Sequence, residues 1–276
     1  MGEHKMTAHE FNNGKPKRIV LITGASSGIG EALAEEYAAD GWDLVLSARR
    51  QDKLEEVASL LREKYGASAA VIACDLNNPA GPEKLFREVK DQGIKLDALV
   101  NNAGLGYFCV LEELPLKDAH NMLNVNITAL VTLTGLFLPD LLEKRGHIVN
   151  VASNAAFQAV PYMAVYAATK AFVLSYSEAI AYELKNSGVK VTAFCPGATA
   201  SGFQETARMN CSSLVKGKKL PPAQEVAAAG YKAIKQGKGL YIHGWLNQLQ
   251  VYGIRFSPRK LVTKIAAATI KPVDKS

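Results

Sequence analysis

The side chains in this sequence best suited to proton chemistry are a tyrosine, a lysine four residues later and a serine thirteen residues before the tyrosine. They are Tyr166, Lys170 and Ser153. On a helix, positions four apart share one face, so the phenol and the ammonium would lie side by side. Spacing alone says little, because Tyr231 and Lys235 share it without other chemistry nearby. Ser153 distinguishes the first pair, since it follows an apolar run, residues 147–151, typical of a buried strand.

These three side chains suit the reduction of a carbonyl group. Hydride delivery to a carbonyl carbon builds negative charge on the oxygen, which a proton donor must then neutralise. A tyrosine with a pKa of about 10 is a poor proton shuttle at neutral pH. A neighbouring ammonium stabilises the phenolate, so we expect Lys170 to lower the pKa of Tyr166. We expect Ser153 to hydrogen-bond the substrate oxygen and hold it within reach of Tyr166.

A glycine-rich turn near the N-terminus is the second feature with a chemical meaning. Residues 23–30 read Thr-Gly-Ala-Ser-Ser-Gly-Ile-Gly and follow the β-branched run 18–23. Glycines in a strand-to-helix turn let the backbone approach a pyrophosphate, whose charge then lies at the helix N-terminus. A glycine cluster alone is a weak signal, but its place after the first strand of an alternating chain strengthens it. The turn predicts a dinucleotide site that includes Gly24, Ser26, Ser27, Gly28, Ile29 and Gly30.

The exit of the second predicted strand, 43–47, indicates which dinucleotide binds. It is followed by Ala48, Arg49 and Arg50, with no Asp or Glu at 47 or 48. A carboxylate here would accept hydrogen bonds from a ribose 2′-hydroxyl and select NAD, whereas an arginine accommodates a 2′-phosphate. A charge-assisted hydrogen bond to phosphate contributes about 1.5–3 kcal/mol. We therefore expect Arg49 to select NADP(H); the alternative is that both arginines only mark a helix start.

Short apolar runs alternate with helical stretches along the whole chain. This alternation predicts an α/β fold, a Rossmann-type doubly wound parallel sheet flanked by helices. No linker interrupts residues 18–245, so we expect one catalytic domain over 17–250 with a mobile lid at about 201–220. A flexible N-terminal lead is expected over 1–16 and a basic helix or tail over 251–276. The predicted strands are 18–23, 43–47, 69–73, 97–100, 147–151 and 189–194.

Taken together, these motifs resemble the short-chain dehydrogenase/reductase family. The Gly-x-x-x-Gly-x-Gly turn, the segment Asn101-Asn102-Ala103-Gly104 and the Ser…Tyr-x-x-x-Lys set occur in the family's order over about residues 17–245. The resemblance implies catalytic roles for Ser153, Tyr166 and Lys170, and for Asn126, which falls on the asparagine that holds a proton-relay water. The cofactor contacts that it implies further are Asp75, Leu76, Asn102, Ala103, Gly104, Tyr166, Lys170, Pro196, Gly197, and Thr199 or Ser201.

The implied activity is NADP(H)-dependent transfer of a hydride between nicotinamide and a carbonyl or secondary alcohol, with Tyr166 as general acid/base. Apolar positions around the motifs favour a bulky substrate such as a ketosteroid or a 3-oxoacyl compound. Two alternatives stay open: an epimerase or dehydratase of the same fold, and a non-catalytic NADP(H)-binding sensor. The positions expected to line the pocket are Leu105, Tyr107, Phe108, Asn154, Phe157, Tyr162 and Met163, with Phe203, Met209 and Leu214 in the lid.

Composition bounds the remaining classes of function. The 276 residues are 48% apolar and carry a net charge of +6, of which residues 255–276 account for +5. A charge confined to a tail gives little support for nucleic-acid binding, so we expect no nucleic-acid partner. No metal site is expected, because the five histidines have no ligand spacing. Four scattered cysteines and a polar start without a signal peptide favour a reducing, cytoplasmic location.

Two kinds of helix suggest partners. The predicted helices 118–144 and 166–186 are apolar over more than one stripe, so we expect a homodimer or homotetramer to cover them; burial inside one chain is the alternative. Residues 258–270 form a basic amphipathic stretch that either docks on protein or rests on anionic lipid. We favour docking over membrane contact, because the stripe is short and lacks Trp and Phe.

Overall fold

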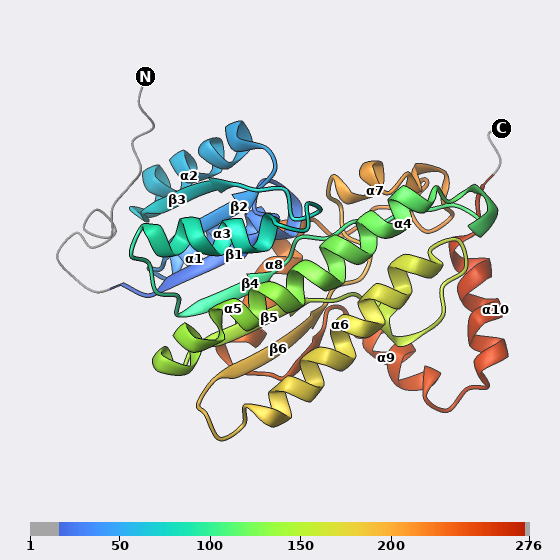
Figure 1. The fold of residues 1–276 in the computed structure, drawn as a ribbon. Helices are drawn as coiled ribbons and strands as arrows, with labels where there is room; N and C mark the ends of the chain where they lie inside the picture. Colours follow the sequence, from blue (N-terminus) through green and yellow to red (C-terminus); the bar gives the residue numbers. More distant parts are fainter. Residues whose placement is uncertain (1–16, 274–276) are drawn as a thin grey trace.

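The parallel sheet is the centre of the structure, a computed structural model that describes residues 17–273. Within these residues the sheet has seven strands in the order β3-β2-β1-β4-β5-β6-β7 (Figure 1). The order reverses between β1 and β4, which opens a crevice at the carboxyl ends of these strands. The strands are β1 Ile19–Thr23, β2 Asp43–Ala48, β3 Ala69–Ala73, β4 Ala98–Asn101, β5 His147–Val151, β6 Lys190–Cys195 and β7 Leu240–Ile242.

The expectation of a doubly wound parallel sheet is confirmed, with one strand more than the sequence predicted. The six predicted strands recur within about one residue at each end. The seventh, β7, has three residues and pairs only with β6. Such a run is too short for hydrophobic periodicity to separate it from a loop. The predicted lead over 1–16 lies outside the described residues.

Helices cover both faces of the sheet because successive strand residues point to opposite sides. In β1, Val20 and Ile22 pack against α1, α2 and α8, whereas Leu21 packs against α3 and α5. The strands are therefore buried on both faces, which explains their nearly continuous apolar runs. The helices of these two layers are α1 Gly28–Ala39, α2 Gln51–Tyr65, α3 Gly81–Asp91, α5 Ala129–Lys144, α6 Ala164–Glu183 and α8 Ala223–Lys235.

A π-helical turn interrupts the predicted helix 118–144. The helix α4, Leu116–Leu123, continues through η3, Asn124–Thr128, into α5. By length and composition this whole segment, Leu116–Lys144, could cross a membrane, and half of its most apolar window is buried inside the fold. π-Turns often occur at functional sites. Here the turn carries Asn126 toward the carboxyl end of the sheet.

The C-terminal part forms a helical hairpin that folds back onto the body (Figure 1). It consists of α9, Trp245–Ile254, and α10, Arg259–Ile270, so the predicted boundary at residue 250 falls inside α9. One face of α10 is buried through Val262, Ala266 and Ile270. The hydroxyl of Ser212 donates to the carbonyl of Ile270 at 3.1 Å. This face docks on the chain's own body, as the sequence analysis favoured.

Candidate active site

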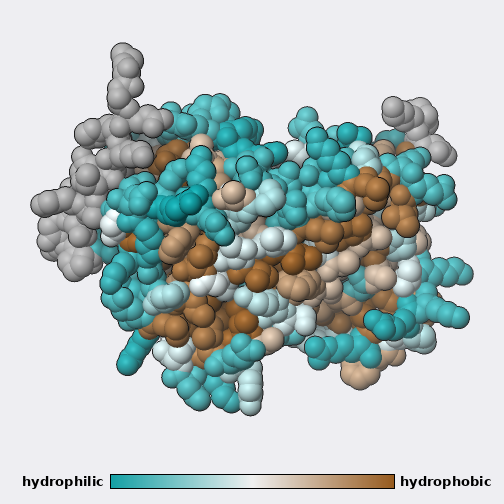
Figure 2. Space-filling model, viewed as in Figure 1, coloured by the Kyte–Doolittle hydropathy of each residue, from teal (hydrophilic) through white to brown (hydrophobic). Residues whose placement is uncertain are grey.

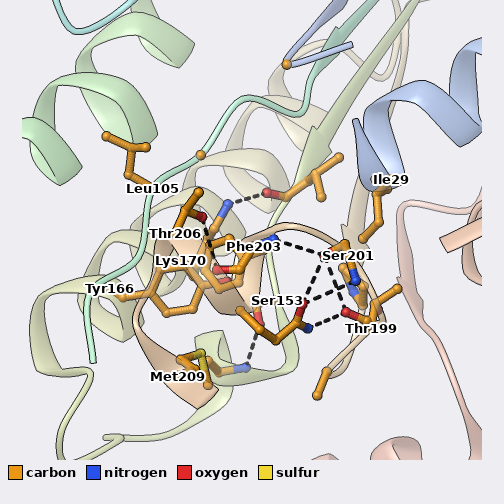
Figure 3. A pocket seen from close by; sticks show the side chains of 18 of the residues that line it. Ile29, Leu105, Ser153, Tyr166, Lys170, Thr199, Ser201, Phe203, Thr206 and Met209 are labelled. Carbon is orange, nitrogen blue, oxygen red and sulfur yellow. Dashed lines mark hydrogen bonds between the residues drawn. The ribbon is translucent and has the colours of Figure 1, made fainter. Parts of the chain in front are cut away.

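One large cavity of about 850 Å³ lies at the carboxyl ends of the strands. Every residue assigned to the site from sequence lines it, except Gly30 and Asn126. Tyr166 and Lys170 lie toward one side and Thr199, Ser201 and Ile29 toward the other, with Ser153 between the two groups (Figure 3). The structure therefore brings together residues that are up to 177 positions apart in the sequence, from Gly24 to Ser201.

The glycine turn between β1 and α1 has the shape that a pyrophosphate site needs. Gly24 and Gly28 have φ angles of +68° and +62°, which L side chains rarely adopt. Gly30 faces the turn instead of the cavity, and a Cβ there would lie 2.3 Å from the carbonyl oxygen of Gly24. Side chains at Gly24 and Gly30 would thus collide with the end of β4 or with the turn itself, so the tight cradle requires glycine there. This cradle fits a dinucleotide, because the first residues of α1, Gly28 and Ile29, line the cavity behind it.

Asn102 fixes the glycine turn to the end of β4. Its side-chain amide donates to the carbonyl oxygens of Thr23 at 2.9 Å and Gly24 at 3.2 Å. The backbone N–H groups of Asn102 and Ala103 both donate to the Thr23 hydroxyl at 3.1 Å. These contacts give the Asn-Asn-Ala-Gly segment a physical role: it holds two strand exits together beside the cradle.

Two exposed arginines line the far end of the cavity. Arg49 and Arg50 follow β2, and Arg50 donates to the hydroxyl of Ser26 at 3.4 Å. Asp75 and Leu76 line the same end after β3, where the Asp75 carboxylate accepts from the N–H of Asn77 at 3.0 Å. The end that would hold the adenosine part therefore carries a guanidinium pair and one carboxylate.

Tyr166 and Lys170 lie together on the buried side of α6. The ammonium of Lys170 is 5.9 Å from the centre of the Tyr166 ring and donates to the carbonyl of Val151 at 2.7 Å. That carbonyl ends β5, so the ammonium ties the helix to the strand that precedes Ser153. The Ser153 hydroxyl accepts from the N–H of Ala155 at 3.1 Å.

Burial dominates the electrostatics of this pair. It raises the pKa of Tyr166 to about 12, against the opposing effect of a hydrogen bond with Ser153. It lowers the pKa of Lys170 to about 8. The expectation that Lys170 lowers the pKa of Tyr166 stays a prediction, because burial is the largest influence on the phenol in this arrangement. The phenol is thus held in its protonated form at neutral pH, the form that donates a proton.

Asn126 supports the site from behind the cavity wall. Its side-chain oxygen accepts from the N–H of Leu105 at 2.8 Å, and its amide donates to the Leu105 carbonyl and to the Thr169 hydroxyl, each at 2.9 Å. The side chain is thereby engaged by protein groups on two elements. Its predicted catalytic role stays a prediction, and the geometry adds a positioning role for the segment after Gly104.

The loop after β6 closes the side of the cavity opposite Tyr166. The hydroxyl of Thr199 donates to the Gly197 carbonyl at 3.0 Å, and that of Ser201 donates to the Thr199 carbonyl at 3.3 Å. Both residues line the cavity beside Pro196 and Gly197. Thr199 and Ser201 therefore both stay candidates for the cofactor contact.

The other end of the cavity is apolar, and sequence reasoning found only part of it. Leu105, Asn154, Met163, Phe203, Met209 and Leu214 line it as expected. Tyr107, Phe108, Phe157 and Tyr162 do not, and Phe108 is buried in a neighbouring core cluster. Sequence reasoning missed the residues that the C-terminal hairpin brings to the cavity, because nothing local indicates that these helices fold back: Asn247, Gln250, Ala266, Thr269 and Ile270.

The parallel sheet, the glycine cradle and the set of Ser153, Tyr166 and Lys170 define a Rossmann-type, nicotinamide-dinucleotide oxidoreductase. The chain belongs to the short-chain dehydrogenase family, whose model matches residues 18–212. It is 35% identical over 187 residues to serine 3-dehydrogenase of Rhizobium radiobacter, covering 67% of this chain and 73% of that protein. It is 36% identical over 186 residues to 11-beta-hydroxysteroid dehydrogenase-like 3 of Arabidopsis thaliana, covering 67% and 60%.

Solved structures agree in fold and differ in the cofactor bound. A short-chain dehydrogenase from Sphingobium yanoikuyae in complex with NADPH is 30% identical, with a TM-score of 0.77 over 87% of this chain and 94% of that one. A short-chain dehydrogenase/reductase from Burkholderia phymatum in complex with NAD is 26% identical, with a TM-score of 0.76 over 94% and 98%. The bulky-bulky ketone specific alcohol dehydrogenase from Comamonas testosteroni is 28% identical, with a TM-score of 0.74 over 87% and 92%. The chain is thus an NAD(P)(H)-type enzyme acting on alcohol or carbonyl substrates.

The second Tyr-x-x-x-Lys pair provides a matched control for the first. Tyr231 and Lys235 both donate to the carboxylate of Asp40, at 2.9 and 2.7 Å, on the opposite side of the sheet from α6. We expect Tyr166→Phe to lower kcat by about a hundredfold or more, because the proton donor is lost. The NADPH dissociation constant, measured by fluorescence titration, should stay within about twofold, since the ring is kept.

Tyr231→Phe should leave kcat unchanged and lower only the midpoint of thermal unfolding, because its hydroxyl serves Asp40. Substantial turnover by Tyr166→Phe, or an equal loss of kcat in both variants, would contradict the role given to Tyr166.

Proposed function

We propose that the protein is an NADP(H)-dependent reductase/dehydrogenase for a bulky, largely apolar carbonyl compound or the matching secondary alcohol. The observation that carries the proposal is the apolar end of the cavity next to Tyr166. Val160, Met163, Met209, Val215 and Ile270 line it, and the ring of Phe203 lies 5.4 Å from that of Tyr166. Binding of an apolar substrate here is favourable because it removes apolar surface from water. The same lining offers few hydrogen-bond partners to a polyhydroxylated substrate.

The chain's own groups account for the proton side of the reaction. A bound nicotinamide supplies or accepts the hydride. The Ser153 hydroxyl orients the carbonyl oxygen of the substrate, and the phenol of Tyr166 donates its proton to that oxygen as negative charge develops. The phenol is protonated at neutral pH, which is the form that reduction requires. In the reverse direction Tyr166 must first lose its proton, so alcohol oxidation should rise toward alkaline pH.

The named relatives support a bulky substrate only in part. A hydroxysteroid dehydrogenase-like protein and a bulky-bulky ketone specific dehydrogenase fit the apolar cavity, whereas serine 3-dehydrogenase is named for a small polar substrate. The apolar side chains around Tyr166 favour the first kind. Ketosteroids and 3-oxoacyl thioesters are the two classes that we propose.

A substrate series tests this choice. NADPH consumption should be measured with ketosteroids and long 3-oxoacyl thioesters, and with small polar carbonyl compounds as the matched set. We expect kcat/KM to be at least tenfold higher for the apolar set, because burial of a few methylene groups alone provides about that factor. Comparable or higher values for the polar compounds would overturn the substrate class and leave the reaction type intact.

We further propose that Arg49 confers the preference for NADP(H), supported by its position at the adenosine end of the cavity. Arg49→Asp should shift the ratio of kcat/KM for NADPH over NADH toward NADH by about ten- to a hundredfold, since a charge-assisted phosphate contact is lost. Arg62→Asp is the control, because it removes an exposed arginine of α2 that does not line the cavity. A ratio that does not move in Arg49→Asp would argue against the assignment.

We also propose a homodimer or homotetramer that meets through the outer faces of α4–α5 and α6. Figure 2 shows a band of apolar residues along α4 and α5, where Leu123 and Leu142 are exposed, and Phe172 and Tyr182 are exposed on α6. Light scattering should give a molar mass of two or four times 29.7 kDa. A mass of one chain would contradict the proposal.

We place the enzyme in the cytoplasm, consistent with four free thiols.

A further inference from the structure

The hairpin of α9 and α10 carries an unusual number of large apolar side chains on its outside. Phe256 is 90% exposed, Trp245 72% and Leu249 64%. Soluble monomers rarely expose apolar side chains so densely without a binding partner. We define the outer face of the hairpin by its exposed apolar residues, which are Trp245, Leu246, Leu249, Tyr252, Phe256, Leu261 and Ile265.

The outer face is separate from the apolar side of each helix that packs on the body of the protein. On α9, Trp245, Leu249 and Tyr252 follow one another at helical spacing on the exposed side, while Val251 is buried. On α10, Leu261 and Ile265 are exposed, while Val262, Ala266 and Ile270 pack against the body. Each helix therefore has an inner apolar face that is already covered and a second apolar face that is not.

The hairpin that carries the outer face is also positively charged. Arg255, Arg259, Lys260 and Lys264 are all exposed on the hairpin, and none of them forms an ion pair within residues 17–273. The sequence has no Asp or Glu from residue 226 to residue 273. The surface that covers the outer face must therefore accept aromatic and aliphatic side chains and also provide negative charge.

We propose that the hairpin is a peripheral anchor that rests on an anionic lipid surface. Trp, Tyr and Phe side chains bind at the boundary between headgroups and acyl chains, and nearby Arg and Lys side chains bind anionic headgroups. A second copy of the chain fits less well. A two-fold interface through this face would bring the same four cations of each copy together, and residues 226–273 provide no carboxylate between them.

The basic stripe at 258–270 has no aromatic residue of its own. The helix α9 and the turn that leads into α10 add the exposed rings of Trp245, Tyr252 and Phe256 to the same hairpin. Residues on the inner sides of the same two helices line the cavity, among them Asn247 and Ala266. If the proposed function holds, an apolar substrate dissolved in lipid would have a short path to the site.

Vesicle flotation of the full chain tests the anchor without any turnover measurement, so it can fail independently of the proposed function. The probes are vesicles of phosphatidylcholine alone and of phosphatidylcholine with 30% phosphatidylserine, in low and high salt. We expect binding to the anionic vesicles, at least tenfold weaker binding to the neutral ones, and weakening by salt. In a Trp42→Phe background Trp245 is the sole tryptophan, and its emission should shift to the blue on anionic vesicles.

Two double variants separate the apolar and the electrostatic contributions. Trp245→Ser with Phe256→Ser should weaken binding to anionic vesicles at least tenfold, and so should Lys260→Gln with Lys264→Gln. The matched controls are Leu60→Ser, which removes an exposed apolar side chain from α2, and Lys53→Gln with Lys64→Gln on the same helix. Both controls should bind like the parent chain.

Three results would overturn the anchor. The first is equal partition of the parent chain onto neutral and anionic vesicles or onto neither. The second is equal weakening of binding in the controls and the hairpin variants. The third is a fall in the molar mass of the Trp245→Ser, Phe256→Ser variant without a change in vesicle binding, which would assign the outer face to a second copy of the chain.

Discussion

The hydrogen bond between the buried Lys170 ammonium and the carbonyl of Val151 is the interaction on which the rest of the site depends. A cation taken from water is costly unless hydrogen bonds replace the lost hydration. The carbonyl of Val151 provides one at 2.7 Å, and it is available because β5 ends there. The helix α6 is thereby fixed against the strand that delivers Ser153.

A second polar network, made of buried side chains, links the strands and helices near the carboxyl ends of β4 and β5. The Asn101 amide donates to the Thr134 hydroxyl at 3.1 Å and to the Asn150 side-chain oxygen at 2.9 Å, and Asn150 donates to Ser177 at 2.9 Å. These groups link β4, β5, α5 and α6 in the interior, where unpaired amides would be costly. The network places no group in the cavity. It keeps the elements that do so in one relative position.

The fold and most of the cofactor side of the site could be predicted from sequence, because both depend on local patterns. Alternating apolar runs, the glycine turn and the segment Asn101–Gly104 each occupy a few consecutive residues with a direct physical meaning. The strand β7 is too short to be recognised in this way. The direction of the Tyr166 pKa shift was also beyond reach, since it depends on burial by residues distant in sequence. For the same reason the hairpin's contribution to the cavity, through residues such as Ile270, has no local signal.

The C-terminal hairpin contributes to the substrate end of the cavity, and this contribution affects how the enzyme can diversify. The cradle, the proton donor and their supports lie within residues 18–212, the stretch shared with the family model. One wall of the substrate end is supplied by α9 and α10, which lie beyond that stretch. Insertions or exchanges in the last thirty residues can therefore reshape which molecules are admitted while the machinery for moving a hydride and a proton is inherited unaltered. The share of the selectivity that α9 and α10 provide can thus change without a change in the chemistry.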